Sequence, residues 1–339
     1  MEKKVKLKLN KKIMVSKSLL QSSPSFGEPV PIIGKVRGGQ ATISIIGVGL
    51  IGGSFALALK DKKLVQHVIG VDNNATNSAV ALELCLVDEI LLLEDAIKKS
   101  DIVFIAIPVD ATVNVLKSIL NLINPNQIVL DAGSTKFALV NSIKNHKMRS
   151  RFVPTHPMWG TEFSGPEAAE RNAFIGKACV ICDKEKTAYD ALETVENLYK
   201  QIGMHLVYMG AEAHDVHAAY VSHISHITSF ALANTVLEKE KEDDAIFELA
   251  SGGFESTVRL AKSNSKMWVP IFKQNKENVL DVLNEHISQL KKFKSCLEKE
   301  NYEYLTQLID GANEIKNSLN PKTTAPSNSP EGGELLMRG

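Results

Sequence analysis

The most constraining feature of this chain is residues 47–52, Gly-Val-Gly-Leu-Ile-Gly, which lie between a β-branched run and an amphipathic stretch. A Gly-x-Gly-x-x-Gly pattern is weak by itself, but a strand before it and a helix after it indicate a dinucleotide-binding turn. The first glycine permits a tight turn, the second lets the backbone approach a pyrophosphate, and the third lets the helix pack closely. The free N–H groups and dipole of the helix attract the anion. The residues predicted to bind the cofactor here are Gly47, Gly49, Leu50, Ile51 and Gly52.

A second predicted strand ends in Asp72, 20 residues after Gly52, where a ribose-binding acid is expected. Its carboxylate accepts hydrogen bonds from ribose hydroxyls and repels a 2′-phosphate. Asn73 and Asn74 follow it instead of an arginine. The sequence therefore predicts NAD rather than NADP as the cofactor. The alternative is a degenerate nucleotide fold that binds nothing.

The composition supports a folded chain with two domains. The 339 residues include 39 basic and 39 acidic side chains and are 44% hydrophobic, which excludes overall disorder and argues against a broad electrostatic grip on nucleic acid. Residues 1–40 nevertheless contain nine Lys and Arg but only two Glu. We predict that they form a basic, flexible extension.

Residues 41–209 alternate short apolar runs with amphipathic stretches, which predicts an α/β Rossmann-type doubly wound sheet that binds NAD. Helical patterns between the runs include 54–60 and 112–122. The predicted strands are Ile43–Ile46, Val68–Val71, Ile102–Ile107, Ile128–Leu130, Phe152–Thr155, Ala178–Ile181 and His205–Tyr208.

After residue 209 the strand patterns stop. Long helices are predicted over 211–239, 276–299 and 302–318, so residues 210–319 are expected to form an all-helical domain. Residues 320–339 are rich in Pro, Ser, Thr and Gly and predict a flexible tail.

Cys179 and Cys182 form a C-x-x-C pattern, but Val180 and Ile181 between them favour a buried strand over a redox or zinc site. Four cysteines do not make a disulfide framework in a chain of this length, so a reducing compartment is expected. Residues 38–59 are uncharged and long enough to span a bilayer, but their glycines and β-branched residues favour a strand, turn and helix. A soluble, cytoplasmic protein is predicted, with a transit peptide in the Lys- and Ser-containing start as the alternative.

Ligands of Rossmann sheets bind at the carboxyl ends of the strands, so the loops there hold the candidate site. Pro108 follows one strand and is expected to cover the nicotinamide side of the cofactor. His156 is expected at another strand end, with its side chain in the cofactor crevice. A dehydrogenase must remove a hydroxyl proton while hydride leaves the same carbon, and histidine has a suitable pKa. The alternative is a histidine hydrogen-bonded within its own turn.

Several blocks together resemble the prephenate/arogenate dehydrogenase family over residues 41 to about 300. They are Gly-x-Gly-Leu-Ile-Gly-Gly-Ser, Asp-x-Gly-Ser-x-Lys, His-Pro-Met-x-Gly-Thr-Glu-x-Ser-Gly, Ser-His-Ile-x-His and Gly-Gly-Phe followed by Arg and Met-Trp. The resemblance implies an NAD-dependent oxidative decarboxylation in tyrosine biosynthesis. Prephenate gives 4-hydroxyphenylpyruvate in this reaction, and arogenate gives tyrosine.

The resemblance also implies roles for individual residues. His156 takes the proton of the substrate 4-hydroxyl, and Ser134 orients that histidine and the substrate. Arg259 binds a substrate carboxylate, for which its planar fork is suited. The other implied substrate-site residues are His226 as a polar pocket residue, Glu162 as a gate or network partner of Arg259, and Trp268 as a pocket wall.

Glu255 and Ser256 follow the Gly-Gly-Phe block where relatives often have another polar pair, which leaves recognition of the substrate side chain open. His223 and His226 are three residues apart on a predicted helix, but no third ligand has matching spacing, so no metal is expected. On an ideal helix, His214 and His217 project roughly opposite to His223 and are expected to contact solvent or a subunit partner.

The predicted partners are a small-molecule substrate, prephenate or arogenate, and a second copy of the chain, since the resemblance implies a homodimer through the helical domain. Neither nucleic acid nor a membrane is an expected partner. Prephenate is the first choice of substrate. The alternatives are an arogenate dehydrogenase, another Rossmann-plus-helical dehydrogenase such as a 3-hydroxyacid enzyme, and a non-catalytic NAD-sensing protein.

Overall fold

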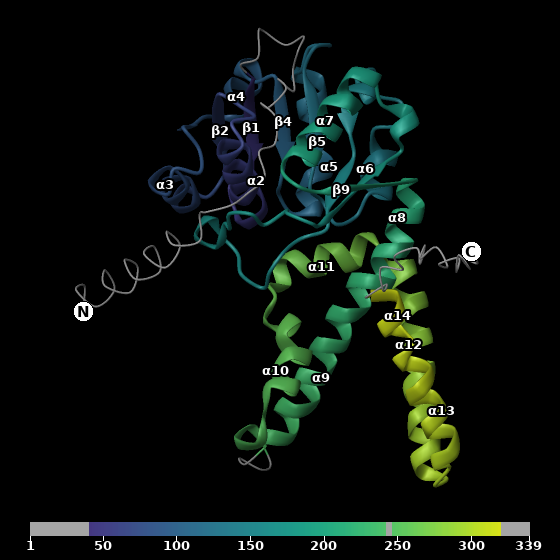
Figure 1. Ribbon diagram of the computed structural model, residues 1–339. Helices are drawn as coiled ribbons and strands as arrows, with labels where there is room; N and C mark the ends of the chain where they lie inside the picture. Colours follow the sequence, from purple (N-terminus) through teal and green to yellow (C-terminus); the bar gives the residue numbers. More distant parts are fainter. Residues whose placement is uncertain (1–40, 242–245, 320–339) are drawn as a thin grey trace, which may run out of the picture. The chain divides into compact units, whose positions relative to one another are not determined.

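The computed structural model describes residues 41–241 and 246–319 (Figure 1). The chain divides between Gly210 and Ala211 into two compact units. The predicted extension, residues 1–40, and the predicted tail, residues 320–339, lie outside the described residues.

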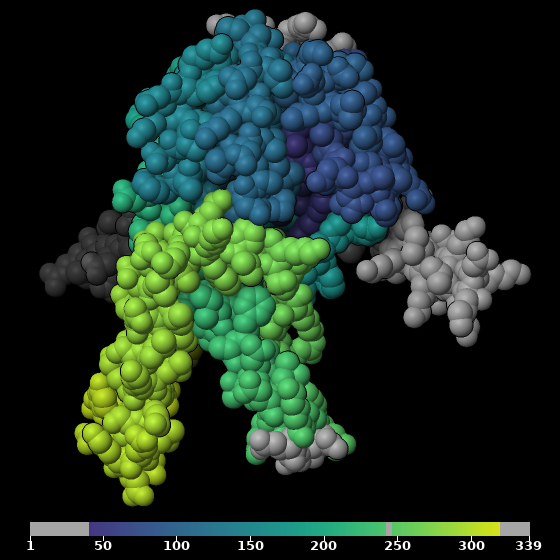
Figure 2. Space-filling model, turned by 180° about the vertical axis from the view of Figure 1, so that it is seen from behind, coloured from purple at the N-terminus to yellow at the C-terminus, as the bar shows by residue number. Residues whose placement is uncertain are grey.

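The first unit contains a six-stranded parallel sheet with the order β3-β2-β1-β4-β5-β6. Its central strand β1 is buried and rich in isoleucine, as expected for a strand with both faces covered. The purple start of this unit is largely hidden behind later, blue segments in Figure 2. The strands are β1 (Thr42–Ile46), β2 (His67–Val71), β3 (Glu89–Ile90), β4 (Ile102–Ile105), β5 (Ile128–Asp131) and β6 (Phe152–Val153).

Helices alternate with these strands, which confirms the predicted α/β fold class. The helix after the glycine turn begins at Leu50, four residues before the predicted start, and Phe55 on it packs against Phe104 of β4 in the core. The helices are α2 (Leu50–Asp61), α3 (Ala75–Glu83), α4 (Leu93–Lys99), α5 (Val109–Leu122), α6 (Phe137–Ser142) and α7 (Tyr189–Gln201), with short 3-10 turns η3 (Arg149–Arg151), η4 (Pro166–Ala168) and η5 (Lys184–Lys186).

A second, three-stranded sheet contains β7 (Thr155–Pro157), β8 (Ala178–Cys182) and β9 (His205–Met209). β7 is antiparallel to β8, and β8 is parallel to β9. The prediction of one strand over 152–155 is wrong, because Pro154 separates β6 from β7 and the two belong to different sheets. Proline has no N–H to donate to a ladder, so it marks the change of sheet.

The C-x-x-C pattern lies in β8, where Cys179 and Cys182 are both buried and not disulfide-bonded. The prediction of a buried strand is therefore confirmed.

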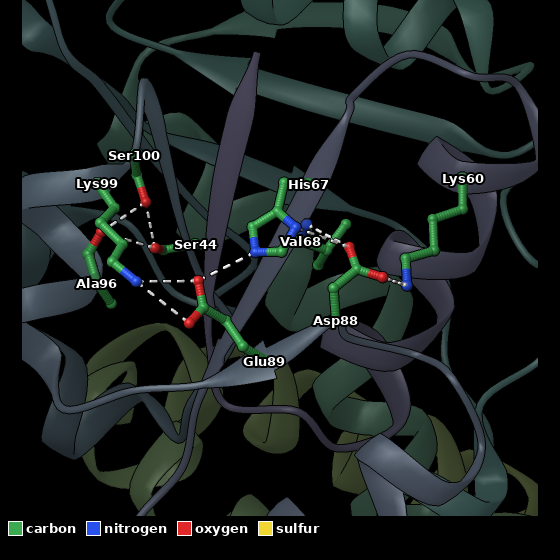
Figure 3. Close-up of polar contacts among 9 residues, drawn as sticks. All are labelled: Ser44, Lys60, His67, Val68, Asp88, Glu89, Ala96, Lys99 and Ser100. Carbon is green, nitrogen blue, oxygen red and sulfur yellow. Dashed lines mark hydrogen bonds and ion pairs between the residues drawn. The ribbon is translucent and has the colours of Figure 1, made fainter. Parts of the chain in front are cut away.

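The edge strand β3 was not predicted from the sequence. It pairs with β2, and charged side chains add further contacts between the two strands (Figure 3). His67 lies between two carboxylates, with Nε2 3.0 Å from Glu89 and Nδ1 3.5 Å from Asp88. Each carboxylate also pairs with a lysine, Lys60 of α2 or Lys99 of α4. These contacts fasten a strand of only two residues to the helices beside it.

The second unit is helical. One helix was predicted over 211–239, but a π-helix, η6 (Ala219–His223), separates α8 (Ala211–Ala218) from α9 (Ile224–Glu240). The helix predicted over 302–318 is also divided into two. The remaining elements are η7 (Phe247–Leu249), α10 (Gly252–Val258), η8 (Arg259–Lys262), α11 (Ser265–Gln274), α12 (Lys276–Glu298), α13 (Tyr302–Asn313) and α14 (Ile315–Leu319).

Within this unit, α9 packs against α10, and α12 packs against α13, so that the far ends of the two pairs form separate arms in Figures 1 and 2. None of the helices in the described part of the chain is long and apolar enough to cross a membrane.

Candidate active site

The glycine turn joins β1 to α2, and each glycine meets a different steric demand. Gly47 has a φ of +93°, and a Cβ there would lie 2.6 Å from the carbonyl oxygen of Ala106. A Cβ on Gly52 would lie 2.0 Å from the carbonyl oxygen of Gly47. Both positions therefore require glycine for the turn to close on the helix.

Gly49 differs from these two glycines because a Cβ on it would meet no atom within 4 Å. It is the N-cap of α2, and Leu50 and Ile51 are the first helical residues, so their N–H groups lie in the turn where i−4 carbonyl partners are lacking. A helix N-terminus with open space beside its cap is suited to hold a phosphate group.

Asp72 directly follows β2, and its carboxylate lies against the glycine turn. Oδ2 accepts from the N–H of Val48 at 3.1 Å, and Oδ1 accepts from the N–H of Asn74 at 2.8 Å. The Gly47 N–H also donates to the Val71 carbonyl at 2.8 Å. These bonds position the carboxylate at the carboxyl end of β2, beside the turn.

Pro108 is the exposed N-cap of α5, at the carboxyl end of β4. β4 pairs with β1, and the Ala106 N–H donates to the Ile46 carbonyl at 2.8 Å. Strands β1 and β4 are where the chain order of the sheet reverses, the point at which open α/β sheets bind ligands. Pro108 thus lies close to the glycine turn.

Ser134 is half-buried in the loop between β5 and α6, and a buried carboxylate organises this loop. Asp131 accepts from the Gly133 N–H at 2.9 Å and pairs with Lys136, whose side chain is also fully buried. Removing one member of such a pair would leave the other charge buried without a partner, which is strongly destabilising. The pair therefore constrains the conformation of the loop.

His156 is half-buried and is the central residue of β7, paired with Val180. The expected position, at the end of a strand of the main sheet, is wrong, because β7 belongs to the small sheet. Its neighbour Thr155 donates its backbone N–H to Asp131 at 3.1 Å. The same carboxylate therefore bonds the Ser134 loop and the strand that carries His156.

Glu162 is half-buried in the long segment between β7 and β8. This segment is attached to α2, where the Glu170 N–H donates to the Ser54 hydroxyl at 2.9 Å. Gly53 makes the approach possible, since a Cβ there would lie 2.9 Å from the Cβ of Ala169.

The second unit brings His226, Trp268 and Arg259 together. The rings of His226 and Trp268 stack with their centroids 3.5 Å apart. Burial lowers the pKa of His226, a hydrogen bond to the Ser222 carbonyl opposes this, and the positive charge of Arg259 lowers the pKa further. Because Nδ1 bonds that carbonyl at 3.0 Å, it carries the proton, and Nε2 of the neutral ring is an acceptor.

Trp268 is buried, and its indole N–H has no hydrogen-bond partner among the described residues. A buried donor of this kind is costly unless it is satisfied, so the indole N–H is suited to donate to a bound ligand. Arg259 is the first residue of η8 and is exposed. Glu162, which was expected to form a network with Arg259, belongs to the first unit.

A buried polar network that was not predicted from the sequence adjoins this cluster through His223, whose ring contacts Trp268. Asn275 donates to the Asp215 carbonyl at 2.7 Å and contacts His223 Nδ1 at 3.2 Å. His214 is buried and bonds Asp215 at 2.8 Å, so its predicted exposure is wrong. In the sequence, the adjacent residues His214 and Asp215, together with Asn275 at the start of a predicted helix, were the signal that could have indicated this network.

His223 is neutral in this network. Burial lowers the pKa of His223 to about 4, although Asp215 opposes the shift. Its ring packs edge-on against Trp268 and Phe272. Among the described residues, no three His, Cys, Asp or Glu side chains are grouped as metal ligands.

Comparison with known proteins identifies both units. Residues 55–208 match the nucleotide-binding domain of prephenate dehydrogenase, and residues 210–310 match its dimerization domain. The chain belongs to the prephenate dehydrogenase family. The nucleotide-binding and dimerization domains of this family thus correspond to the α/β unit and the helical unit.

Individual relatives agree with this family membership. A prephenate dehydrogenase of Bacillus subtilis is 32% identical over 281 residues, which cover 82% of this chain and 76% of the relative. A crystal structure of prephenate dehydrogenase from Aquifex aeolicus, in complex with hydroxyphenyl propionate and NAD+, is 30% identical, with a TM-score of 0.76 over 83% of this chain and 98% of that chain. The arogenate dehydrogenase of Synechocystis is 25% identical, with a TM-score of 0.67 over 82% of this chain and 99% of that chain.

Proposed function

We propose that this protein catalyses the NAD-dependent oxidative decarboxylation of prephenate to 4-hydroxyphenylpyruvate in tyrosine biosynthesis. The observation that carries the proposal is a half-buried imidazole, His156, and a half-buried hydroxyl, Ser134, on two segments joined by one buried carboxylate. The Ser134 loop follows β5, and the strand of His156 follows β6; in the sheet, β4 lies between β5 and β1, the strand that leads into the glycine turn. An imidazole near a nucleotide site is suited to remove the proton of a hydroxyl whose carbon loses hydride.

The cofactor would be held by the glycine turn. Gly49 leaves room at the N-terminus of α2 for a pyrophosphate, and the Asp72 carboxylate accepts from ribose hydroxyls and repels a 2′-phosphate. Pro108 borders the nicotinamide end. NAD, when bound, supplies the acceptor for the hydride that leaves the hydroxyl-bearing ring carbon.

The side chains of the protein bind and orient the substrate and remove its proton. His156 accepts the proton of the 4-hydroxyl, and Ser134 orients the imidazole and the substrate. Arg259 binds a substrate carboxylate, and Glu162 is a gate or network residue. His226 and Trp268 form the polar and apolar wall of the substrate pocket, to which the Trp268 indole N–H contributes a donor. The ring carboxylate leaves as carbon dioxide, driven by aromatisation, so the site mainly positions groups and removes a proton.

Arogenate is the second candidate substrate, and the tautomer of His226 favours it. The neutral ring offers Nε2 as an acceptor, which suits the ammonium group of arogenate better than the keto group of prephenate. Glu255, one turn before Arg259, adds a carboxylate, but Lys262 pairs with it at 3.8 Å. The doubly anionic character of prephenate and the positive charge of Arg259 support the first candidate.

The test measures NADH formation by its near-ultraviolet absorbance with prephenate and with arogenate, and identifies the products. We expect turnover of prephenate with NAD and at least about tenfold lower kcat/KM with NADP. Turnover of arogenate alone would assign the second candidate. No turnover of either substrate, together with tight NAD binding, would favour an NAD-sensing protein.

Two variants test the assigned roles. His156→Asn is expected to lower kcat by about a hundredfold or more, with KM for prephenate nearly unchanged. Arg259→Ala is expected mainly to raise KM, by about tenfold or more. Near-normal turnover of His156→Asn would show that another group accepts the proton.

We further propose that the protein is a homodimer formed by the helical unit. The family name of this unit, dimerization domain, and the exposed apolar side chains on α12 support this assembly.

A further inference from the structure

Tyr199 lies on α7 in the core of the first unit and is fully buried. Its hydroxyl is 2.8 Å from the Thr155 hydroxyl, and it also bonds the thiol of Cys179. Burial raises the pKa of both the Tyr199 phenol and the Cys179 thiol, so both groups carry their protons. The proposed reaction assigns no role to either side chain.

The hydrogen bonds around Tyr199 have a defined direction. The Thr155 hydroxyl bonds the backbone carbonyl of Asp131, which can only accept, so Thr155 donates there and accepts from the Tyr199 O–H. The Cys179 thiol donates to the Val180 carbonyl at 3.8 Å, accepts from the backbone N–H of His156 and lies against the Tyr199 hydroxyl. Directed hydrogen bonds therefore run from Tyr199 through Thr155 to Asp131, and the thiol of Cys179 borders them.

These hydrogen bonds compensate for weak local support of β7. The strand has three residues and is an edge strand, paired only with β8 in its own sheet. Thr155 and Pro157 are buried on one face, whereas the half-buried His156 alternates to the other. Pairing along one edge leaves the tilt of such a short strand poorly constrained, and the bonds of Thr155 to Asp131 attach it to β5.

We propose that Tyr199 is a positioning residue, whose hydroxyl fixes the strand bearing His156 relative to the Asp131-organised loop bearing Ser134. The inference rests on the proposed roles of His156 and Ser134. The alternative is that the hydroxyl only satisfies its own hydrogen bonds in the core. A misplacement of about 1 Å in a catalytic group can lower a rate by about a hundredfold, so the two alternatives differ measurably.

The experiment uses the full-length protein and two matched pairs of variants. Tyr199→Phe removes only the hydroxyl, and its control is Tyr189→Phe on the same helix, where the tyrosine is 77% exposed. Thr155→Val removes the hydroxyl of the next residue in the chain of bonds, whereas Thr155→Ser retains it. Thermal unfolding is measured for all four, and kcat and KM for both substrates are measured with NAD.

We expect Tyr199→Phe and Thr155→Val to lower kcat by about tenfold with KM changed by less than about twofold. Tyr189→Phe and Thr155→Ser are expected to remain within about twofold of the unmodified protein in both constants. If Tyr199→Phe does not fold, the Thr155 pair carries the test. Equal kcat in Thr155→Val and Thr155→Ser, or a normal kcat in Tyr199→Phe, would overturn the inference.

A second readout does not depend on turnover. The imidazole signal of His156 is assigned by NMR from its disappearance in His156→Asn and is followed in the same variants without substrate. We expect it to shift or split in Tyr199→Phe but not in Tyr189→Phe, and an unchanged signal would contradict the positioning role. If neither substrate is turned over but this signal moves as expected, the proposed function fails while the positioning by Tyr199 stands.

Discussion

At the residue scale, two glycines of the turn differ in what they are needed for: Gly52 for the fold, and Gly49, we propose, for cofactor binding. Gly52 has no space for a side chain, whereas Gly49 is surrounded by open space and has an ordinary φ of −76°. A methyl group at Gly52 therefore disturbs the turn itself. At Gly49 it occupies only the space proposed for the pyrophosphate.

We predict that Gly52→Ala lowers the free energy of unfolding by more than about 2 kcal/mol, because its Cβ overlaps the Gly47 carbonyl. Gly49→Ala is expected to change stability by less than about 1 kcal/mol but to raise the Kd for NAD at least about tenfold. Urea denaturation and fluorescence titration with NADH measure the two effects. Normal cofactor affinity in Gly49→Ala would mean that the ligand does not approach this backbone.

The lowered pKa of His223 makes the stability of the folded protein depend on pH. Its folded pKa of about 4 lies below the ordinary histidine value of 6.5, so the unfolded chain binds more protons between these values. The stabilising contribution is therefore fully present above about pH 6.5 and is lost as the pH falls towards 4.

We predict that this residue alone makes the protein about 3 kcal/mol less stable at pH 4 than at pH 6.5. His223→Gln keeps an acceptor for Asn275 but does not titrate, so its stability should vary less over this range. The control is His217→Gln, an exposed histidine on α8. Urea denaturation at several pH values measures the difference, and parallel pH curves for His223→Gln and the unmodified protein would contradict the prediction.

At the element scale, the edge strand β3 depends on side chains more than on strand pairing. Asp88, directly before it, accepts from the Val68 N–H at 2.8 Å and pairs with Lys60 (Figure 3). Burial raises the pKa of Asp88, but the hydrogen bonds from Lys60 and Val68 outweigh it and lower the pKa below its usual range.

We predict that Asp88→Asn lowers the free energy of unfolding by about 1 kcal/mol at neutral pH, because the charged acceptor is lost. The depressed pKa means that this contribution exists above the unfolded value of 3.8 and is lost as the pH falls through the folded value. The difference between the two proteins in urea denaturation should therefore shrink below about pH 4. Asp95→Asn, which removes an exposed pair with Lys98, is the control and should have less than half the effect.

At the scale of the whole molecule, the helical unit exposes large apolar side chains on α12. Leu280, Ile287, Leu290 and Leu297 are exposed on α12, and seven residues separate the members of the pairs 280 and 287, and 290 and 297. A seven-residue spacing of apolar side chains is typical of a seam between packed helices. This spacing supports the proposed dimer through α12.

We predict that Leu290→Glu weakens the dimer at least about a hundredfold, because each of two copies of the leucine loses its apolar contact and a charge is buried. Sedimentation velocity over a range of concentrations measures the dissociation. The control is Leu92→Glu, which changes a 78% exposed leucine in the other unit and should leave the dimer intact. An unaltered dimer in Leu290→Glu would exclude this part of α12 from the interface.

The fold class, the family and the position of the glycine turn could all be predicted from the amino-acid sequence. The glycine spacing and the run of isoleucines before it are properties of neighbouring residues, and local sterics and periodicity decide what such residues form. The same holds for β8, where Val180 and Ile181 indicated a buried strand despite the flanking cysteines.

The tertiary structure decided features that depend on distant residues or on a change of helical phase. The π-helix η6 adds about one residue to a turn, so His223 lies about 80° from His214 around the helix and not opposite to it. Thr155 bonds Asp131 and Tyr199, which are 24 and 44 residues away in the chain, and these bonds determine how the strand of His156 is held. No local pattern specifies such pairs, because they form only after packing has brought separate segments together.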